Sequence, residues 1–203
     1  MRESASLLGY RLSGGSTGAR LVWLSNGKRA VEKIHDPTPD PLNDVYAEAG
    51  SYELDGLLGY HRVPVTVVIP GKPLRSLQYF IAGSKSGSDL NIEPYATDPS
   101  LMLFDALIDN FDRNPGNIVV SKQDGRLYAI DNSFAFSTKE LRAERIEFDR
   151  ISRDDLQDFY ARLMLATPHL IRDRLGHTLS SARISALLRR REALLNLVRQ
   201  HLP

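Results

Sequence analysis

Residues 103–120 and 127–132 decide the fold. They read Leu-Phe-Asp-Ala-Leu-Ile-Asp-Asn-Phe-Asp-Arg-Asn-Pro-Gly-Asn-Ile-Val-Val and Leu-Tyr-Ala-Ile-Asp-Asn. The apolar spacing of Leu103, Leu107 and Ile108 predicts a helix at the start of the first segment. A polar loop follows this helix, and two short apolar strands joined by a turn at residues 122–125 come next. The order predicts a loop of polar side chains held between a helix and a β-hairpin.

The loop and the hairpin present Asp112, Asn117 and Asp131 at fixed spacing. Asp112 and Asn117 are five residues apart, so a carboxylate can meet a substrate hydroxyl while an amide oxygen reaches a metal ion. Asp131 ends the second strand, where its carboxylate can meet the same metal from the other side. The pattern favours phosphoryl transfer, which needs mainly Mg²⁺, an oriented nucleophile and positive charge. A tight turn is the alternative interpretation of the loop, because Asn, Pro and Gly are also turn residues.

The stretch Asp112-Arg113-Asn114-Pro115-Gly116-Asn117, followed by Ala129-Ile130-Asp131-Asn132, resembles the catalytic and metal loops of the protein-kinase-like superfamily. It is most similar to the branch of HipA-type, phosphoinositide and secretory-pathway kinases. The sequence departs from most kinases at Asn132, where many have Phe, and it lacks a later Ala-Pro-Glu. The resemblance implies a two-lobed α+β fold, with a small antiparallel sheet plus one helix in residues 1–83 and a mainly helical C-lobe in residues 84–203.

Phosphate-binding parts are predicted upstream of this stretch. The glycine-rich loop comprises Gly14, Gly15, Ser16, Thr17 and Gly18, where backbone amides could approach the phosphates of ATP. Asn26-Gly27 predicts a hairpin, and the next strand carries Lys33, which resembles the kinase lysine that holds the α- and β-phosphates. A helix beginning at Val45 and ending at Gly59 supplies Glu48 as the partner of Lys33, with Glu53 as the alternative.

Further elements follow from periodicity. Strands are expected at residues 65–69 and 76–81, an adenine-binding hinge near residues 80–83 and a flexible link at residues 84–88. Helices are expected at residues 150–165 and 184–202. The basic run at residues 189–191 is interpreted as a solvated helix face. Arg113 could neutralise charge in the transition state or pair with a backbone group, and we favour the second role.

Composition limits the partners and the compartment. The chain has 203 residues, 42% of them hydrophobic, which is enough for one core or two small lobes. Its 26 basic and 25 acidic residues give no general reason to bind nucleic acid or a membrane surface. Cysteine is absent, which excludes disulfides and fits a reducing compartment. We expect a monomer with a protein substrate and no membrane span, either cytoplasmic or secreted into a host cell without a Sec signal peptide.

The resemblance implies Mg-ATP-dependent transfer of the γ-phosphoryl group to a Ser/Thr hydroxyl of a partner protein. Asp112 would orient the hydroxyl, Asn117 and Asp131 would hold Mg²⁺, and Lys33, fixed by Glu48, would hold the phosphates of ATP. The small C-lobe suggests, by analogy, a bacterial effector- or toxin-type kinase. The alternatives are a phosphoinositide or small-molecule kinase, a nucleotidyl transferase and a non-catalytic binding module.

Overall fold

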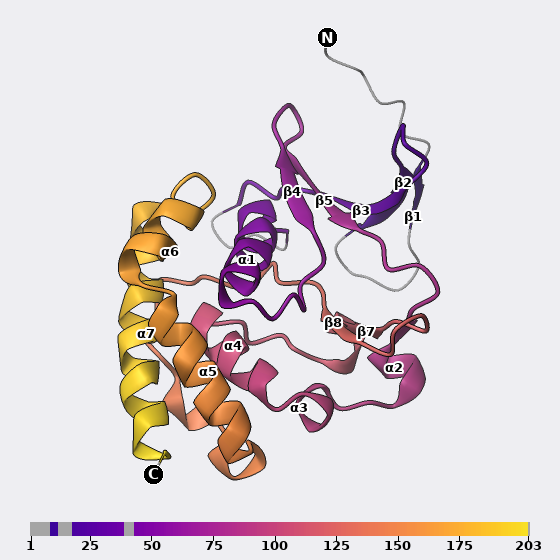
Figure 1. Ribbon diagram of the computed structural model, residues 1–203. Coiled ribbons are helices and arrows are strands. Elements are labelled where there is room, and N and C mark those ends of the chain that lie inside the picture. Colours follow the sequence, from indigo (N-terminus) through magenta and orange to yellow (C-terminus); the bar gives the residue numbers. More distant parts are fainter. Residues whose placement is uncertain (1–8, 12–17, 39–42, 203) are drawn as a thin grey trace.

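The computed structural model describes residues 9–11, 18–38 and 43–202. A sheet of five antiparallel strands and a group of helices lie at opposite ends of the molecule, and helix α1 lies between them (Figure 1). This is the small sheet, single helix and helical lobe that the sequence predicted, so the α+β fold class is confirmed.

The five-stranded sheet has the order β1-β2-β3-β5-β4. Its strands are β1 (Gly9–Arg11), β2 (Arg20–Trp23), β3 (Arg29–Ile34), β4 (Thr66–Ile69) and β5 (Arg75–Tyr79). The predicted hairpin is present, because the turn at Asn26-Gly27 joins β2 to β3, and Gly27 has the positive φ of 76° that such turns need. The register pairs Lys33 with Ser76, which places the lysine on the central strand of the sheet, near the end of that strand.

Helix α1 (Val45–Leu58) has well-defined ends. The Asp44 side chain accepts hydrogen bonds from the backbone N–H groups of Tyr46 and Ala47, and Gly59 closes the helix with φ 75°. An acidic N-cap and a left-handed glycine are strong start and stop signals, so the predicted helix is confirmed. Glu48 lies in the first turn, where the helix dipole favours a carboxylate.

From residue 85 onward the chain contains a three-stranded sheet and several helices. The strands are β6 (Lys85–Ser86), β7 (Ile118–Val120) and β8 (Leu127–Ala129), in the order β6-β7-β8. The helices are α2 (Gly87–Leu90), α3 (Pro94–Thr97), α4 (Ser100–Ile108), α5 (Arg153–Leu165), α6 (Pro168–Leu175) and α7 (Ser181–Gln200), with 3-10 turns η1 (Pro115–Asn117), η2 (Ala143–Arg145) and η3 (Phe148–Arg150).

Two expectations for residues 84–203 are wrong. Residues 84–88 are not a flexible link, because Lys85 and Ser86 pair with Val120 and Val119 of β7 and α2 begins directly afterwards. The basic run at residues 189–191 is not a solvated face: Arg190 is fully buried and Arg191 nearly so, and only Arg189 is exposed. Both buried guanidinium groups donate to backbone carbonyls.

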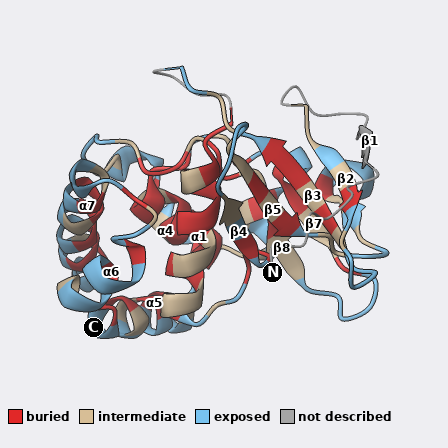
Figure 2. Cartoon of the chain, turned by 90° about the horizontal axis from the view of Figure 1, so that it is seen from above, coloured by how far each residue is buried: buried red, intermediate tan, exposed pale blue. Residues whose placement is uncertain are grey.

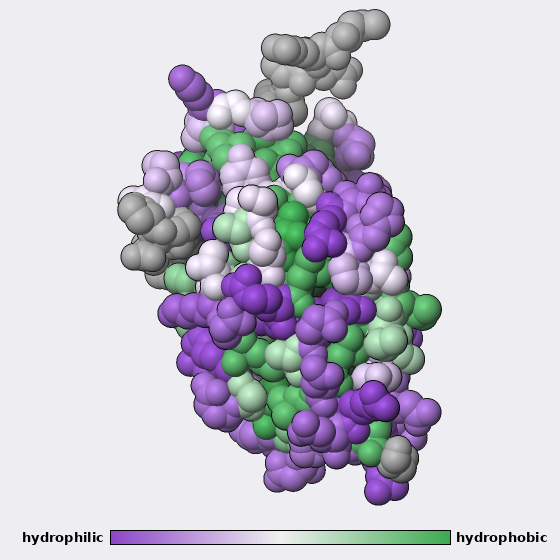
Figure 3. Space-filling view, turned by 90° about the vertical axis from the view of Figure 1, so that its left-hand side faces the viewer, coloured by the Kyte–Doolittle hydropathy of each residue, from purple (hydrophilic) through white to green (hydrophobic). Residues whose placement is uncertain are grey.

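One hydrophobic core extends through α1 and α4–α7. It contains Leu54 and Leu58 of α1 together with Leu103, Phe104 and Leu107 of α4. In Figure 2 the buried residues concentrate on α1, α4 and the neighbouring strands, while the outer sides of α5–α7 are exposed. Figure 3 views the side that carries α6 and α7 and shows a mainly hydrophilic surface with hydrophobic residues between the polar side chains. No helix in the described part of the chain is long and apolar enough to cross a membrane.

Candidate active site

The β7–β8 hairpin brings Asn117 and Asp131 together. Ile118 is opposite Ala129 in the register, so Asn117 precedes one strand at the position where Ile130 follows the other. Ile130 N–H donates to the Asn117 carbonyl at 3.0 Å. Asp131 comes next, with a φ of 54° in the left-handed region. A non-glycine residue in this conformation is uncommon and concentrates at functional sites.

Asp112 is fixed by the amide of Asn117. Asn117 Nδ2 donates to Asp112 Oδ2 at 3.0 Å and to its backbone carbonyl at 2.6 Å. The loop between them is closed by Asn114, whose side chain accepts from Gly116 N–H at 2.9 Å. Because both Asn117 donor contacts go to Asp112, the amide oxygen is the atom left to face a cation.

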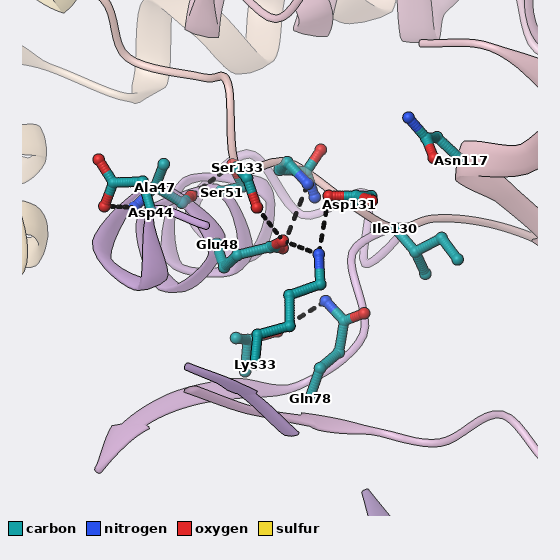
Figure 4. Close-up of polar contacts among 12 residues, drawn as sticks. Lys33, Asp44, Ala47, Glu48, Ser51, Gln78, Asn117, Ile130, Asp131 and Ser133 are labelled. Atoms are coloured by element: carbon teal, nitrogen blue, oxygen red, sulfur yellow. Dashed lines mark hydrogen bonds and ion pairs between the residues drawn. The ribbon is translucent and has the colours of Figure 1, made fainter. Parts of the chain in front are cut away.

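Lys33 lies between two carboxylates from different elements (Figure 4). Its Nζ forms an ion pair with Glu48 Oε1 of α1 and another, at 2.7 Å, with Asp131 Oδ1. Burial opposes the charge of Lys33, but Glu48 and Asp131 together raise its pKa above the ordinary value. The predicted pairing of Lys33 with Glu48 is therefore confirmed. Glu53, the alternative, contacts Thr178 and His177 instead.

Glu48 also binds the segment that follows Asp131. Its Oε2 accepts from Asn132 N–H at 3.2 Å, and its Oε1 accepts from Ser133 Oγ at 2.9 Å. Glu48 is 2% exposed, so this carboxylate is out of water and must be satisfied by such donors. One side chain of α1 thus holds both the lysine of the sheet and the backbone beside Asp131.

The Arg113 side chain connects the loop at residues 112–117 with the segment at residues 130–132. Its guanidinium forms a bidentate pair with Asp105 of α4, with both N···O distances 3.0 Å. It also donates to the carbonyls of Asn117 and Ile130 at 2.7 and 2.6 Å, and to Asn132 Oδ1. Burial alone would lower the pKa of Arg113, but the Asp105 carboxylate outweighs it and raises the pKa. This matches the favoured role of pairing with backbone groups.

Several solved structures share the fold of this chain. The Golgi casein kinase aligns with a TM-score of 0.63 at 17% identity over 95% of this chain and 72% of its own. Hydra Fam20 gives 0.67 at 16% identity over 98% and 87%, and Helicobacter pylori CtkA gives 0.60 at 12% identity over 98% and 93%. No protein-family model matches the sequence, and no curated protein matches it significantly. The chain has an atypical protein-kinase-like fold.

The remaining predicted site residues belong to the glycine-rich loop and the hinge. Gly14, Gly15, Ser16 and Thr17 lie outside the described residues. Gly18 immediately precedes Ala19 and β2, with φ 69° and open space where a Cβ would be. The predicted hinge follows β5, where Phe80 N–H donates to the Arg29 carbonyl at 3.1 Å and the Arg29 guanidinium lies 4.6 Å from the centre of the Phe80 ring.

The donor set suits a hard cation that arrives with phosphate. Within the described residues no group of three or more His, Asp or Glu side chains could hold a metal ion by itself. Asp131 and the Asn117 amide oxygen are hard oxygen ligands, and Mg²⁺ is commonly held by one or two such groups plus substrate phosphates. The residues present therefore fit a Mg²⁺ ion bound together with a nucleotide.

Several supporting residues were missed by the sequence reasoning. Asp105 and Ser133 hold Arg113 and Glu48 but lie in no kinase motif, and Asn132, which was noted only as a departure from Phe, contacts both Arg113 and Glu48. A signal was available for Asp105, because a carboxylate inside the apolar run of α4 must find a buried cation. No comparable signal was available for Asn132 or Ser133, because their hydrogen-bond partners are distant in the sequence.

Proposed function

We propose that this chain is a Mg-ATP-dependent kinase that transfers the γ-phosphoryl group to a Ser/Thr hydroxyl of a partner protein. The observation that carries the proposal is the pair of ion pairs that Lys33 of the sheet makes with Glu48 of α1 and with Asp131 after β8. Asn117 lies beside this cluster, because its carbonyl accepts from Ile130 N–H, and its amide is hydrogen-bonded to Asp112. The nucleotide would lie between an N-lobe of residues 1–83 and a C-lobe of residues 84–203. A Golgi casein kinase structure containing Mn and ADP supports a nucleotide with a divalent cation in this fold.

Each residue has a chemical role in the proposed reaction. Asp112 accepts the proton of the substrate hydroxyl while the oxygen of that hydroxyl bonds to the γ-phosphorus of ATP. The bond between the γ-phosphorus and the β,γ-bridging oxygen breaks at the same time, and ADP leaves. Lys33, held by Glu48, binds the α- and β-phosphates under the loop of residues 14–18. Asn117 and Asp131 would hold Mg²⁺, which neutralises phosphate charge when bound.

The charges near the segment after Asp131 distinguish a protein acceptor from a phosphoinositide acceptor. A phosphoinositide head group would need a basic cluster, for which the candidates are Lys139, Arg142 and Arg145. Arg142 already pairs with the buried Asp109 at 2.7 Å, so its charge is largely compensated. This favours a protein acceptor over a phosphoinositide. H. pylori CtkA, a proinflammatory kinase, aligns over nearly all of both chains, and this likeness supports the effector-type role that we propose.

The test uses purified protein with Mg²⁺ and ATP labelled separately at the γ- and α-phosphates, incubated with bacterial and eukaryotic lysates. We expect label from γ-ATP in a distinct protein band, and a fall of about 100-fold or more for Asp131→Asn and Lys33→Met. Asp124→Asn, the same change in the exposed turn of the same hairpin, is the matched control and should retain full activity.

The label pattern separates the competing functions. Label from α-ATP alone would establish nucleotidyl transfer, and γ-label in a lipid or a small molecule would favour the phosphoinositide or small-molecule kinase. No transfer from either label by the folded wild-type protein would contradict the kinase proposal. Undiminished γ-label with Asp131→Asn would refute the metal assignment.

A further inference from the structure

Helix α1 is fastened to the C-terminal helices at its first turn. The Asp44 carboxylate, besides capping α1, pairs through Oδ2 with Arg183 in the first turn of α7. Asp44 is 2% exposed, so this ion pair is shielded from solvent on the carboxylate side. The start of α1 is therefore held by a residue more than a hundred positions later in the chain.

The middle of α1 contacts the turn between α6 and α7. A Cβ at Gly50 would lie 3.2 Å from Leu179 Cδ2, so the absence of a side chain lets the turn pack directly on the helix backbone. One turn further along α1, both carboxylate oxygens of Glu53 accept from Thr178 Oγ1, at 3.0 and 2.9 Å. His177 Nε2 lies 3.2 Å from Glu53 Oε1.

The end of α1 is held by α5. Arg162 Nη1 donates to the carbonyls of Leu58 and Gly59 at 3.0 and 3.3 Å, where the last carbonyls of a helix lack partners within the helix. The side chains of Leu54 and Leu58 belong to the same hydrophobic core as the C-terminal helices. The helix is thus fixed along its whole length by α5, the α6–α7 turn and α7.

We propose that α5, the α6–α7 turn and α7 form a built-in clamp that keeps α1 in the position where Glu48 pairs with Lys33, and that Glu53 and Thr178 are positioning residues for this pair. Glu48 lies on α1 between the anchors at Asp44 and Gly50, so a shift of α1 away from the sheet would break the clamp contacts as well as the ion pair. The inference rests on the proposed kinase function and adds to it that no partner is needed to bring α1 into place.

The first experiment removes one hydroxyl from the clamp. Thr178→Val keeps the shape of the side chain and deletes the hydroxyl donor that the two Glu53 oxygens share, and we expect kcat/KM for ATP to fall about tenfold. Hydrogen exchange of the amides in residues 45–58 should accelerate. Thr178→Ser retains the hydroxyl, so its kcat/KM for ATP and its hydrogen exchange in residues 45–58 should match those of the wild-type protein.

The matched control is Thr167→Val. Thr167 Oγ1 accepts from Leu170 N–H at the N-cap of α6, so the change destabilises a neighbouring helix without deleting a contact to α1. It should lower the melting temperature and leave kcat/KM for ATP unchanged. If Thr178→Val and Thr167→Val have the same effect on kcat/KM, the positioning role of Thr178 is wrong.

The second experiment links α1 covalently to the α6–α7 turn. The chain has no cysteine of its own, so two introduced cysteines can pair only with each other within one molecule. A Cβ at residue 50 would lie 3.3 Å from Leu179 Cγ, a separation compatible with a disulfide between Gly50→Cys and Leu179→Cys. The oxidised double variant should keep its activity within about twofold of the reduced form. A tenfold loss on oxidation that reduction reverses would show that α1 must move, and would overturn the clamp.

The two proposals fail in different ways. If the wild-type protein transfers no phosphoryl group, the kinase function falls and the clamp is judged by hydrogen exchange alone: faster exchange in residues 45–58 of Thr178→Val supports it, and unchanged exchange overturns it. If the wild-type protein is active and Thr178→Val is equally active, only the clamp falls.

Discussion

At the residue scale, the site depends on buried charges that satisfy one another. Arg113 is fully enclosed and pairs with Asp105, which is 2% exposed. A buried ion pair adds little net stability compared with an apolar pair, but the loss of one partner leaves the other charge uncompensated. The pair therefore serves to hold the Asn117 and Ile130 carbonyls, and through them the two proposed metal ligands.

Asp105→Asn should show this dependence. The change keeps the size of the side chain and removes the charge that compensates Arg113, so we expect a loss of about 3 kcal/mol in the free energy of unfolding. Urea denaturation measures this loss. Glu147→Gln, which breaks an exposed pair with Arg150, is the control and should leave the urea midpoint unchanged. Equal midpoints for the two variants would contradict the role given to Asp105.

The sequence predicted the residues that carry motif chemistry better than those that support them. Lys33 and Glu48 were paired correctly because a strand lysine and a helix glutamate in this order are typical of kinases. The partner of Arg113 was not predicted, since spacing does not say which of several carboxylates becomes buried beside a given cation. Asp112, Asn117 and Asp131 come together in space, while their chemical roles remain predictions.

At the scale of elements, α7 reaches the segment that follows Asp131. Arg190 is completely buried and donates to the carbonyls of Leu107, Ser137 and Lys139 at 2.8, 2.9 and 2.7 Å. Burial lowers its pKa to about 10, so it remains charged at neutral pH. The end of α4 and the segment at residues 137–139 are both anchored by this one side chain.

Arg190→Met should loosen that segment. The change fills similar space but leaves three carbonyls without their donor, and we expect a loss of about 3 kcal/mol in unfolding free energy with faster hydrogen exchange at residues 137–142. Under the proposed function, phosphorylation of a protein substrate should fall as well. Arg189→Met alters the exposed neighbour, which pairs with Glu140 on the surface, and should change neither property. A stability loss shared by both variants would refute the distinction.

Element prediction failed where elements are short. The α6 helix has eight residues with only Ile171 and Leu175 buried, too few for a clear periodic pattern. Thr167-Pro168 was an available start signal, since Thr caps the helix and Pro occupies its first turn. Strand β6 has two residues and exists because it pairs with β7, and such pairing is not visible in local sequence.

At the scale of the whole molecule, α1 is attached to the helical lobe at its start, middle and end. The order of motifs was enough to predict a two-lobed kinase-like fold, but not this packing, because the contacts of α1 with Thr178, Leu179 and Arg183 join segments remote in sequence. We therefore expect α1 to unfold together with α4 and α7, while the β2–β3 hairpin opens separately at a lower free energy.

Leu194→Ala tests this cooperative unit. Leu194 of α7 is fully buried, so its truncation should cost about 2–5 kcal/mol through lost burial and the cavity left behind. Native-state hydrogen exchange should show an equal loss of protection in α1, α4 and α7 and a smaller loss in β2 and β3. Leu165→Ala, at a side chain that is 75% exposed, should leave protection unchanged throughout. If α1 keeps its protection while α7 loses it, α1 is stabilised by the sheet, and the helical lobe cannot be what holds Glu48 against Lys33.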